Sequence, residues 1–172
     1  MNGSEKEPLL TSPVISNSGP LITLATIGQL DLLAALFGKI IIPKAVHNEV
    51  VVYGEGEPGS REVGEAEWIG TLEVKDRLAI EFLLETLGAG ESEAIVLAQE
   101  LKAEYVLLDD ALARRKACLI GLRVTGTLGI LLMAQDVGLI PAVKLILDEL
   151  RQTEFRMSDR LYQDVLTKAG EA

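Results

Sequence analysis

Short apolar segments rich in β-branched residues alternate along this chain with longer stretches whose apolar residues recur at helical spacing. The short segments are residues 13–16, 39–42, 69–74, 105–108 and 122–125. Two short helices separated at Gly28 are predicted within residues 21–36, and single helices at about 43–52, 60–67, 76–87, 91–102 and 111–120. Three more are predicted near 127–137, 141–153 and 158–168. Strands that alternate with helices imply βαβ crossovers. We therefore expect an α/β fold of three layers, with a mostly parallel central sheet flanked by helices.

Composition supports buried strands. Apolar residues make up 48% of the 172 residues but aromatic residues only 4%, so the core must consist of Leu, Ile, Val and Ala. Such a core favours strands covered by helices over an all-β sandwich. We expect a flexible tail at residues 1–13 and one domain over residues 14–172, with a C-terminal helical extension from about residue 140.

The sequence also limits where the chain is expected to work. Cys118 is the single cysteine and cannot form an internal disulfide, which is typical of a reduced cytoplasmic setting. Residues 1–13 lack the hydrophobic core of a secretion signal, and no apolar run is long enough for a membrane span. The net charge of −10 argues against a protein coated in positive charge for nucleic-acid binding. It does not exclude an acidic site that holds metal ions.

Polar side chains occur where two predicted strands end. Asn17 follows the first strand, and Asp109 with Asp110 follows the strand at 105–108. Ligands of open α/β sheets bind beyond the carboxyl ends of the strands. Two more carboxylates come from predicted helices, Glu49 late in one and Glu91 at the start of another.

The helical phase of Glu91 distinguishes it from Glu93. At about 100° per residue, Glu91 lies within about 45° of the centre of the apolar arc of its helix, and Glu93 roughly 115° away. A carboxylate on the buried side needs a partner, and a metal ion is one candidate. An acid that only stabilises the positive end of the helix dipole is an equally good interpretation. Glu93 is expected at the edge of the helix or in solvent.

Four segments, in order, resemble PIN-domain proteins. Residues 14–22 (VISNSGPLI) are similar to the opening of that family, where a strand ends in an Asp followed by Ser or Thr. Residues 42–50 (IPKAVHNEV) resemble the helix that delivers the family's second acid. Gly90-Glu91 and residues 106–109 (VLLD) resemble the third and fourth positions. The similarity continues into the C-terminal helices, as in short prokaryotic PIN-like proteins of unknown function.

The resemblance implies a divalent-metal-dependent ribonuclease, a class that includes many toxins of toxin–antitoxin pairs. It implies that four residues would bind Mg²⁺ or Mn²⁺: Asn17, Glu49, Glu91 and Asp109. The three carboxylates among them would also be catalytic. Hard dications prefer oxygen ligands, and a pair of ions roughly 3.5–4 Å apart can activate water and stabilise a leaving oxygen. Asn17 stands where the family has Asp, so the site has one negative charge fewer and is expected to bind metal more weakly.

Four further residues are secondary candidates, each with an ordinary structural interpretation beside it. Ser18 is expected to bond the backbone in the turn at residues 17–20, with a contact to a metal-bound water as the less favoured interpretation. One of Asp109 and Asp110 is expected to cap the helix at residue 111 while the other reaches the site. Thr127 is expected to cap the following helix, and Glu93 to lie at the edge of its helix or in solvent.

Possible partners follow from the same residues. Arg114, Arg115 and Lys116 form the densest positive cluster, which is either a solvated helix face or a set of phosphate contacts for single-stranded RNA. A small antitoxin protein is a further implied partner. The apolar helices near 127–137 and 141–153 predict a homodimer. A second hypothesis is a catalytically inactive PIN-like module that binds RNA or protein. A third, a different acidic phosphotransfer or hydrolase fold, has no supporting nucleophile motif in the sequence.

Overall fold

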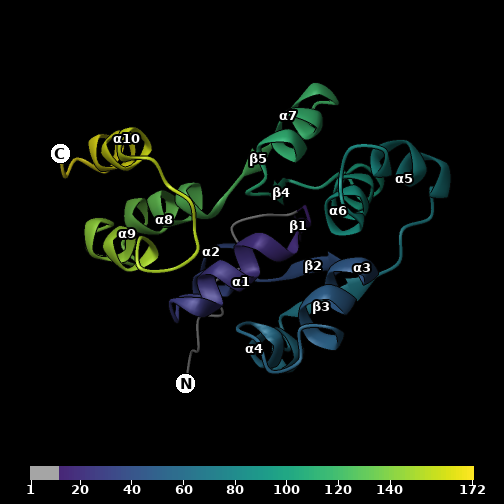
Figure 1. Ribbon diagram of the computed structural model, residues 1–172, viewed down its shortest axis with the longest axis horizontal. Coiled ribbons are helices and arrows are strands. Elements are labelled where there is room, and N and C mark those ends of the chain that lie inside the picture. The colour runs from purple at the N-terminus through teal and green to yellow at the C-terminus, as the bar shows by residue number, and fades with distance from the viewer. Residues whose placement is uncertain (1–11) are drawn as a thin grey trace, which may run out of the picture.

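A computed structural model describes residues 12–172 as an α/β protein with five strands (Figure 1). The strands are β1 (Val14–Ser16), β2 (Ile40–Pro43), β3 (Ile69–Leu72), β4 (Tyr105–Leu107) and β5 (Val124–Thr125). The helices of the first half are α1 (Ser18–Thr26), α2 (Asp31–Phe37), α3 (Lys44–His47), η1 (Asn48–Val52), α4 (Ser60–Glu65) and α5 (Arg77–Leu84). Those of the second half are α6 (Ala89–Glu100), α7 (Ala111–Leu119), α8 (Thr127–Asp136), α9 (Lys144–Leu150) and α10 (Asp159–Ala169).

The central sheet is parallel throughout the described residues. Its strand order is β3-β2-β1-β4-β5, and every neighbouring pair is parallel. The register pairs Ile15 with Ile41 on one side and with Val106 on the other. The predicted three-layer fold with a mostly parallel sheet is confirmed.

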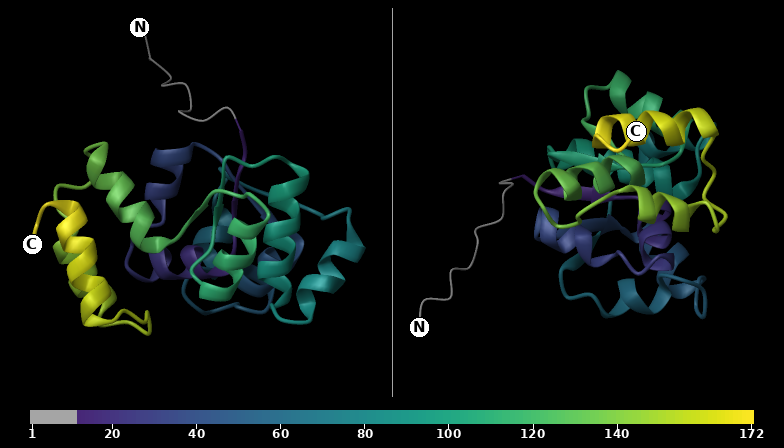
Figure 2. Two further views of the ribbon diagram at one scale, coloured as in Figure 1. Left: turned by 90° about the horizontal axis from the view of Figure 1, so that it is seen from above. Right: turned by 90° about the vertical axis from the view of Figure 1, so that its left-hand side faces the viewer.

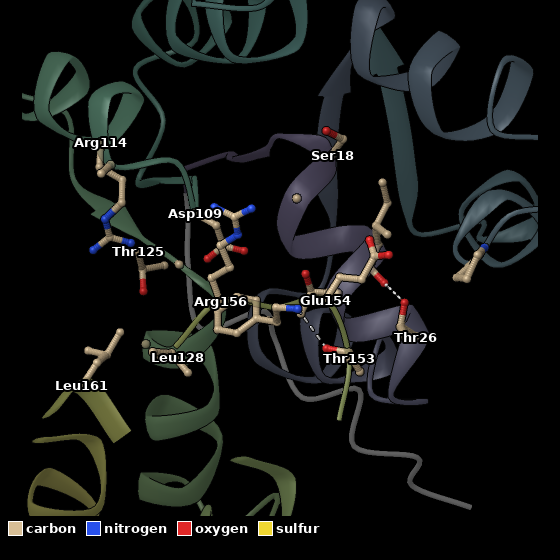
Figure 3. A pocket seen from close by; sticks show the side chains of 18 of the residues that line it. Ser18, Thr26, Asp109, Arg114, Thr125, Leu128, Thr153, Glu154, Arg156 and Leu161 are labelled. Atoms are coloured by element: carbon tan, nitrogen blue, oxygen red, sulfur yellow. Dashed lines mark hydrogen bonds between the residues drawn. The ribbon is translucent and has the colours of Figure 1, made fainter. Parts of the chain in front are cut away.

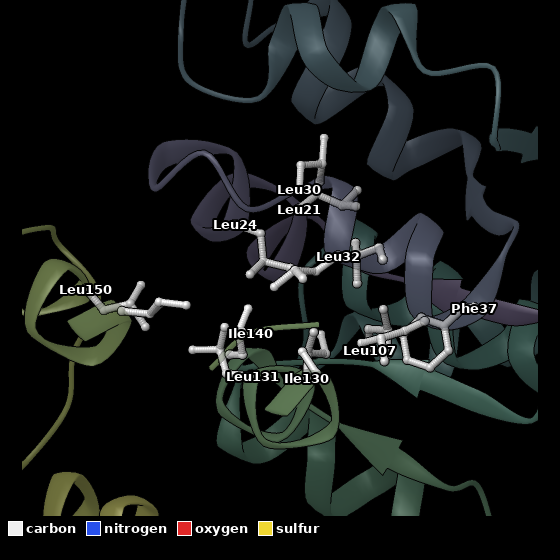
Figure 4. Close-up of a cluster of buried hydrophobic side chains, with 14 of the residues drawn as sticks. Leu21, Leu24, Leu30, Leu32, Phe37, Leu107, Ile130, Leu131, Ile140 and Leu150 are labelled. Carbon is white, nitrogen blue, oxygen red and sulfur yellow. The ribbon is translucent and has the colours of Figure 1, made fainter. Parts of the chain in front are cut away.

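Alternate residues of each strand pack into two separate apolar clusters. Val14, Ile40 and Leu107 belong to the cluster covered by α1, α2 and α8, part of which Figure 4 shows. Ile15 and Val106 point to the opposite cluster, which contains residues of α5, α6 and α7. Because side chains of a strand alternate between its faces, helices on both sides are needed to bury them.

The middle of the sheet is a topological switch point. The chain moves outward from β1 through β2 to β3, then returns to the other side of β1 as β4. Asn17 directly follows β1 and Asp109 follows β4, and the backbone N–H of Asn17 donates to the Leu107 carbonyl at 3.0 Å. Loops at a switch point diverge, which leaves a crevice beyond the carboxyl ends of the strands.

Two helices begin earlier than the sequence predicted. Residues 17–20 were expected to be a turn, but α1 begins at Ser18 with Asn17 as its N-cap residue. Pro20 fits because the first turn of a helix needs no N–H donors. Likewise, α6 begins at Ala89 instead of Glu91, so that Gly90 lies inside its first turn.

The predicted helix over residues 43–52 is interrupted in its geometry. Pro43 ends β2, and the helical segment continues as a short α3 followed by the wider π-helical turn η1. Glu49 lies in η1. A π turn inserts one residue into the helical repeat and so changes the direction of the side chains that follow it, and such turns occur often at functional sites.

The last three helices lie together at one end of the molecule (Figure 2). Most of their apolar residues, including Leu131 and Ile146, pack into the cluster under α1 and α2. Val137, Leu139 and Leu145 stay exposed. Of the tail expected at residues 1–13, positions up to 11 lie outside the described residues, and the Pro13 carbonyl accepts the Glu104 N–H at 2.7 Å. Within residues 12–172, no helix has the length and apolar character that crossing a membrane requires.

Candidate metal and phosphate site

Three of the four predicted ligand positions are joined by hydrogen bonds at the carboxyl edge of the sheet. The amide of Asn17 donates to Glu91 Oε1 at 3.3 Å, from the loop after β1 to the first turn of α6. The hydroxyl of Ser18 lies 3.0 Å from Glu49 Oε1 and 3.5 Å from Asn17 Oδ1. A hydroxyl has one proton, and Glu49 is the nearer and charged acceptor. The expected backbone bond of Ser18 is therefore wrong, because its hydroxyl donates to the Glu49 carboxylate.

Gly90 leaves the space in which two of these oxygens meet. A Cβ atom at position 90 would lie 2.8 Å from Asn17 Oδ1 and 2.9 Å from Glu49 Oε2. Both distances are shorter than carbon–oxygen contacts allow, so only glycine fits here without a shift. Two acceptor oxygens, from the end of β1 and from η1, thus face one small gap beside α6.

Asp109 lies between the first turn of α1, at Gly19, and the start of α8, at Thr127. Its Oδ1 accepts the backbone N–H of Thr127 at 2.7 Å, and its Oδ2 accepts the Thr127 hydroxyl at 2.6 Å. A Cβ atom at Gly19 would lie 3.7 Å from Asp109 Oδ2, which places Asp109 next to the first turn of α1. Thr127 was expected to cap α8, but it is Asp109 that accepts from the helix start while Thr127 orients that carboxylate.

Asp110 caps the helix that follows it. Its Oδ1 accepts the Ala113 N–H at 2.8 Å at the start of α7. The expectation that one of the two neighbouring aspartates caps this helix is confirmed, and that residue is Asp110. Asp109 also has a structural task, since an acid at the start of α8 stabilises the positive end of that helix.

Of the two positions expected for Glu93, solvent is wrong, and the residue lies at the edge of its helix. The exposed fraction of its side chain is 12%, and its Oε2 accepts the backbone N–H of Ala45 at 2.7 Å. Arg77 lies 3.6 Å from its other oxygen. The start of α3 packs against α6, so that the side facing away from the sheet is covered by another helix. Glu93 caps α3 instead of joining the candidate ligands.

A cavity of about 1410 Å³ opens beside these residues (Figure 3). Ser18, Glu49 and Asp109 line it on the side of the sheet. Arg114 also lines it, and its Nη1 donates to the Leu108 carbonyl at 3.0 Å. Of the three predicted phosphate contacts, Arg114 is at the cavity, whereas Arg115 and Lys116 are not among its lining residues.

The model of the DUF3368 family, whose description is PIN domain, matches residues 13–171. This chain belongs to that PIN-domain family. The family resemblance inferred from four short segments is confirmed over nearly the whole chain. None of the curated proteins matches the sequence significantly.

The donor set of this PIN domain suits a hard cation, although its acids are not gathered into a closed cluster. Within residues 12–172, no three His, Cys, Asp or Glu side chains are placed to hold one metal ion together. What favours a cation is the pair of oxygens, from Asn17 and Glu49, that face the gap at Gly90. Glu91 is a third oxygen donor beside them, because its Oε1 accepts from the Asn17 amide at 3.3 Å.

Sequence reasoning missed one wall of the site. Residues between α9 and α10, and residues of α10 itself, line the cavity opposite Glu49: Gln152, Thr153, Glu154, Phe155, Arg156, Leu161, Val165 and Lys168. These residues belong to no strand end and to no family-like motif. Only the basic residues among them, in an acidic chain, offered a signal.

Proposed function

We propose that this PIN domain is a divalent-metal-dependent endoribonuclease whose metal site is weakened by Asn17. The observation that carries the proposal is the convergence of Asn17 Oδ1 and Glu49 Oε2 on the gap at Gly90. Alanine would suit the interior of a helix better than glycine, so glycine here permits the close approach of these two oxygens to α6. A cation bound between acceptor oxygens explains it.

Mg²⁺ or Mn²⁺ is the cation that this chemistry favours, because both prefer carboxylate and amide oxygens over nitrogen and sulfur. Asn17, Glu49 and Glu91 would hold it, and Asp109 lines the same cavity as Glu49. When bound, the ion would supply Lewis-acid polarisation of a phosphodiester oxygen.

The residues of the chain carry the remaining roles in this proposal. Ser18 holds Glu49 in place through its 3.0 Å bond. Thr127 holds Asp109 through its backbone N–H and its hydroxyl, and each oxygen of the carboxylate keeps further acceptor capacity at the cavity lining. Arg114 is placed to contact a phosphate from the cavity wall. Single-stranded RNA is the expected substrate, since its backbone can follow an open crevice.

The test is cleavage of a labelled unstructured RNA by the purified protein in Mn²⁺ and in EDTA. We expect cleavage in Mn²⁺ only, and its loss in Glu91→Gln, which keeps the size of the side chain but removes the charge. Glu85→Gln is the matched control, because Glu85 is exposed at the end of α5. Equal activity in Glu91→Gln and Glu85→Gln would show that the cleavage comes from elsewhere.

A second candidate function rests on Asn17 itself. Asn17 donates its amide to Glu91 instead of repelling it, so the pocket holds together without a metal ion. This favours a PIN domain that binds RNA or a partner protein without cleaving. Binding of the same RNA, with no cleavage at any Mn²⁺ concentration, would select this alternative.

The biological role belongs to the proposal as well. PIN domains of this kind are often toxins that a small antitoxin protein restrains, and a metal-dependent ribonuclease would need such restraint in a cytoplasmic setting. Co-expression of the gene with its small upstream neighbour, where one exists, should relieve growth inhibition. Growth that is equally slow with and without the neighbour would contradict the toxin role.

A further inference from the structure

The C-terminal wall of the cavity, defined as residues 152–168 that line it, differs in charge from the side that carries the candidate ligands. The wall contributes two cations, Arg156 and Lys168, and one carboxylate, Glu154. The opposite side contributes Glu49, Glu57 and Asp109 against the single Arg114. In a chain of net charge −10, the cavity therefore has a locally positive wall that faces an acidic one.

The two cations of this wall are available to a ligand. Both side chains are exposed, and within the described part of the chain neither makes an ion pair or a side-chain hydrogen bond. Arg151, by contrast, pairs with Asp159 and stacks over the ring of Tyr162 at 4.0 Å. Figure 3 shows Arg156 extending from the C-terminal segment across the cavity in the direction of Asp109.

The cavity is large enough to hold part of a polymer. Pockets for small molecules are roughly 300–1,000 Å³. A space of about 1410 Å³ that is bounded by separate chain segments exceeds that range. At about 0.1 M salt, charges further away than roughly 10 Å are screened, so the negative charge of distant parts of the chain acts only weakly on a ligand at Arg156 and Lys168.

We propose that Arg156 and Lys168 contact the backbone phosphates of single-stranded RNA and hold it across the cavity, against the side that carries Glu49 and Asp109. This inference rests on the proposed function and adds to it a substrate-binding surface on the C-terminal helices. Arg156 is the stronger contact, because a guanidinium can bond a phosphate with two parallel N–H donors.

The experiment measures binding of a fluorescein-labelled oligouridine by anisotropy, with the full chain, in EDTA and in Mn²⁺ over a range of salt. Arg156→Ala should weaken binding roughly tenfold or more, the effect expected when one charge-assisted hydrogen bond is removed. The slope of log affinity against log salt should fall by about 0.7 for each phosphate of a single strand that the variant no longer neutralises. Lys168→Ala should reduce the slope similarly, and Arg156→Lys should keep the slope but bind more weakly than the wild type.

Two variants act as controls, and the expected change in RNA affinity differs between them. Arg160→Ala removes an equally exposed arginine, from the start of α10 outside the cavity lining, and should change neither affinity nor slope. Glu154→Gln removes the one carboxylate of the wall and should tighten binding. Thermal melts of all variants should match the wild type, because none of these side chains is buried.

The outcomes separate this inference from the proposed function. If the wild type binds RNA through Arg156 but cleaves nothing in Mn²⁺, the proposed RNA contacts of the wall are supported and the nuclease assignment is wrong. Equal affinities for wild type and Arg156→Ala, or no binding by the wild type, would contradict the proposed RNA contacts of the wall even where cleavage occurs. If a polyglutamate peptide binds as tightly as RNA and depends equally on Arg156, the wall accepts an acidic protein surface and the RNA assignment is overturned.

Discussion

Gly90 is the single residue on which the geometry of the site depends most. Its missing side chain leaves room for oxygens from two other elements, at 2.8 and 2.9 Å from the position of a Cβ atom. From the sequence pattern alone, Gly90 belongs to a helix-breaking stretch. In the structure Gly90 lies inside the first turn of α6, where it does not end a helix but lets Asn17 and Glu49 approach the helix backbone closely.

Gly90→Ala should therefore destabilise the protein and weaken metal binding together. The added methyl group must push Asn17 or Glu49 away, at a cost of about 1–3 kcal/mol, as for overpacked sites. Chemical denaturation and the Mn²⁺-induced rise in Tm measure the two effects. Gly19→Ala is the control, since its Cβ atom would meet Asp109 at an ordinary 3.7 Å. A Gly90→Ala protein as stable as Gly19→Ala, with the same response to Mn²⁺, would contradict this role of Gly90.

Thr127 offers a second test at the scale of one side chain. Thr127→Val keeps the shape of a fully buried residue but removes the hydroxyl that donates to Asp109 at 2.6 Å. The free energy of unfolding should fall by about 1–3 kcal/mol, because a carboxylate oxygen loses its donor. Urea denaturation measures it, with the exposed Thr71→Val on β3 as a control that should change it by less than about 0.5 kcal/mol.

At the scale of elements, the junction of α9 and α10 supports the cavity wall. The Tyr162 hydroxyl donates to Asp148 Oδ1 at 2.6 Å, and Lys144 lies 3.2 Å from the other oxygen. The hydrogen bond from Tyr162, followed by the one from Lys144, lowers the pKa of the Asp148 carboxyl. These contacts join the two helices on either side of the segment that carries Arg156.

This junction should make stability depend on pH in one direction. The pKa of Asp148 is lower in the folded chain, so its stabilising contribution is complete above its unfolded pKa, about 3.9, and is lost as pH falls through the folded value. Asp148→Asn should thus be less stable than wild type at neutral pH, with a gap that closes under acid conditions. The exposed Asp164→Asn is the control in thermal melts. A gap that stays constant down to acid pH would refute the linkage.

The strands and most helices could be predicted because their apolar spacing is local. What could not be predicted depends on contacts between elements. The covered position of Glu93 follows from α3 crossing α6, and no phase calculation on one helix includes a second helix. The π turn η1 has no sequence signature of its own. The ordered set of four ligand positions was recognised by family resemblance, whereas the C-terminal wall lies in a part of the fold without a motif.

For the whole molecule, the homodimer remains a prediction, and the exposed apolar surface that supports it is smaller than the sequence suggested. Much of the apolar surface that suggested it packs under α1 and α2, and Val137, Leu139 and Leu145 are what remains exposed, at 55%, 42% and 72%. Light scattering at micromolar concentration should give twice the mass of one chain, and Leu145→Glu should reduce it. A wild-type monomer under these conditions would rule out a pairing surface of that strength.

The charge of the site as a whole links Asn17 to metal binding. Asn17→Asp adds a fourth carboxylate to Glu49, Glu91 and Asp109 and replaces the amide that now donates to Glu91. Without metal the added repulsion should lower Tm, and with metal the extra anionic oxygen should increase the affinity. Both effects should shrink when Asp109→Asn is made in the same chain, because one of the like charges is then removed.

The most direct measurement is the Tm of wild type and Asn17→Asp with and without Mn²⁺. A ligand that binds only the folded state raises its stability by an amount set by concentration over Kd. We predict a small Mn²⁺-induced rise for wild type, and for Asn17→Asp a lower Tm without metal and a larger rise with it. If Mn²⁺ raises the Tm of neither protein, these residues do not form a metal site, and the nuclease assignment is wrong.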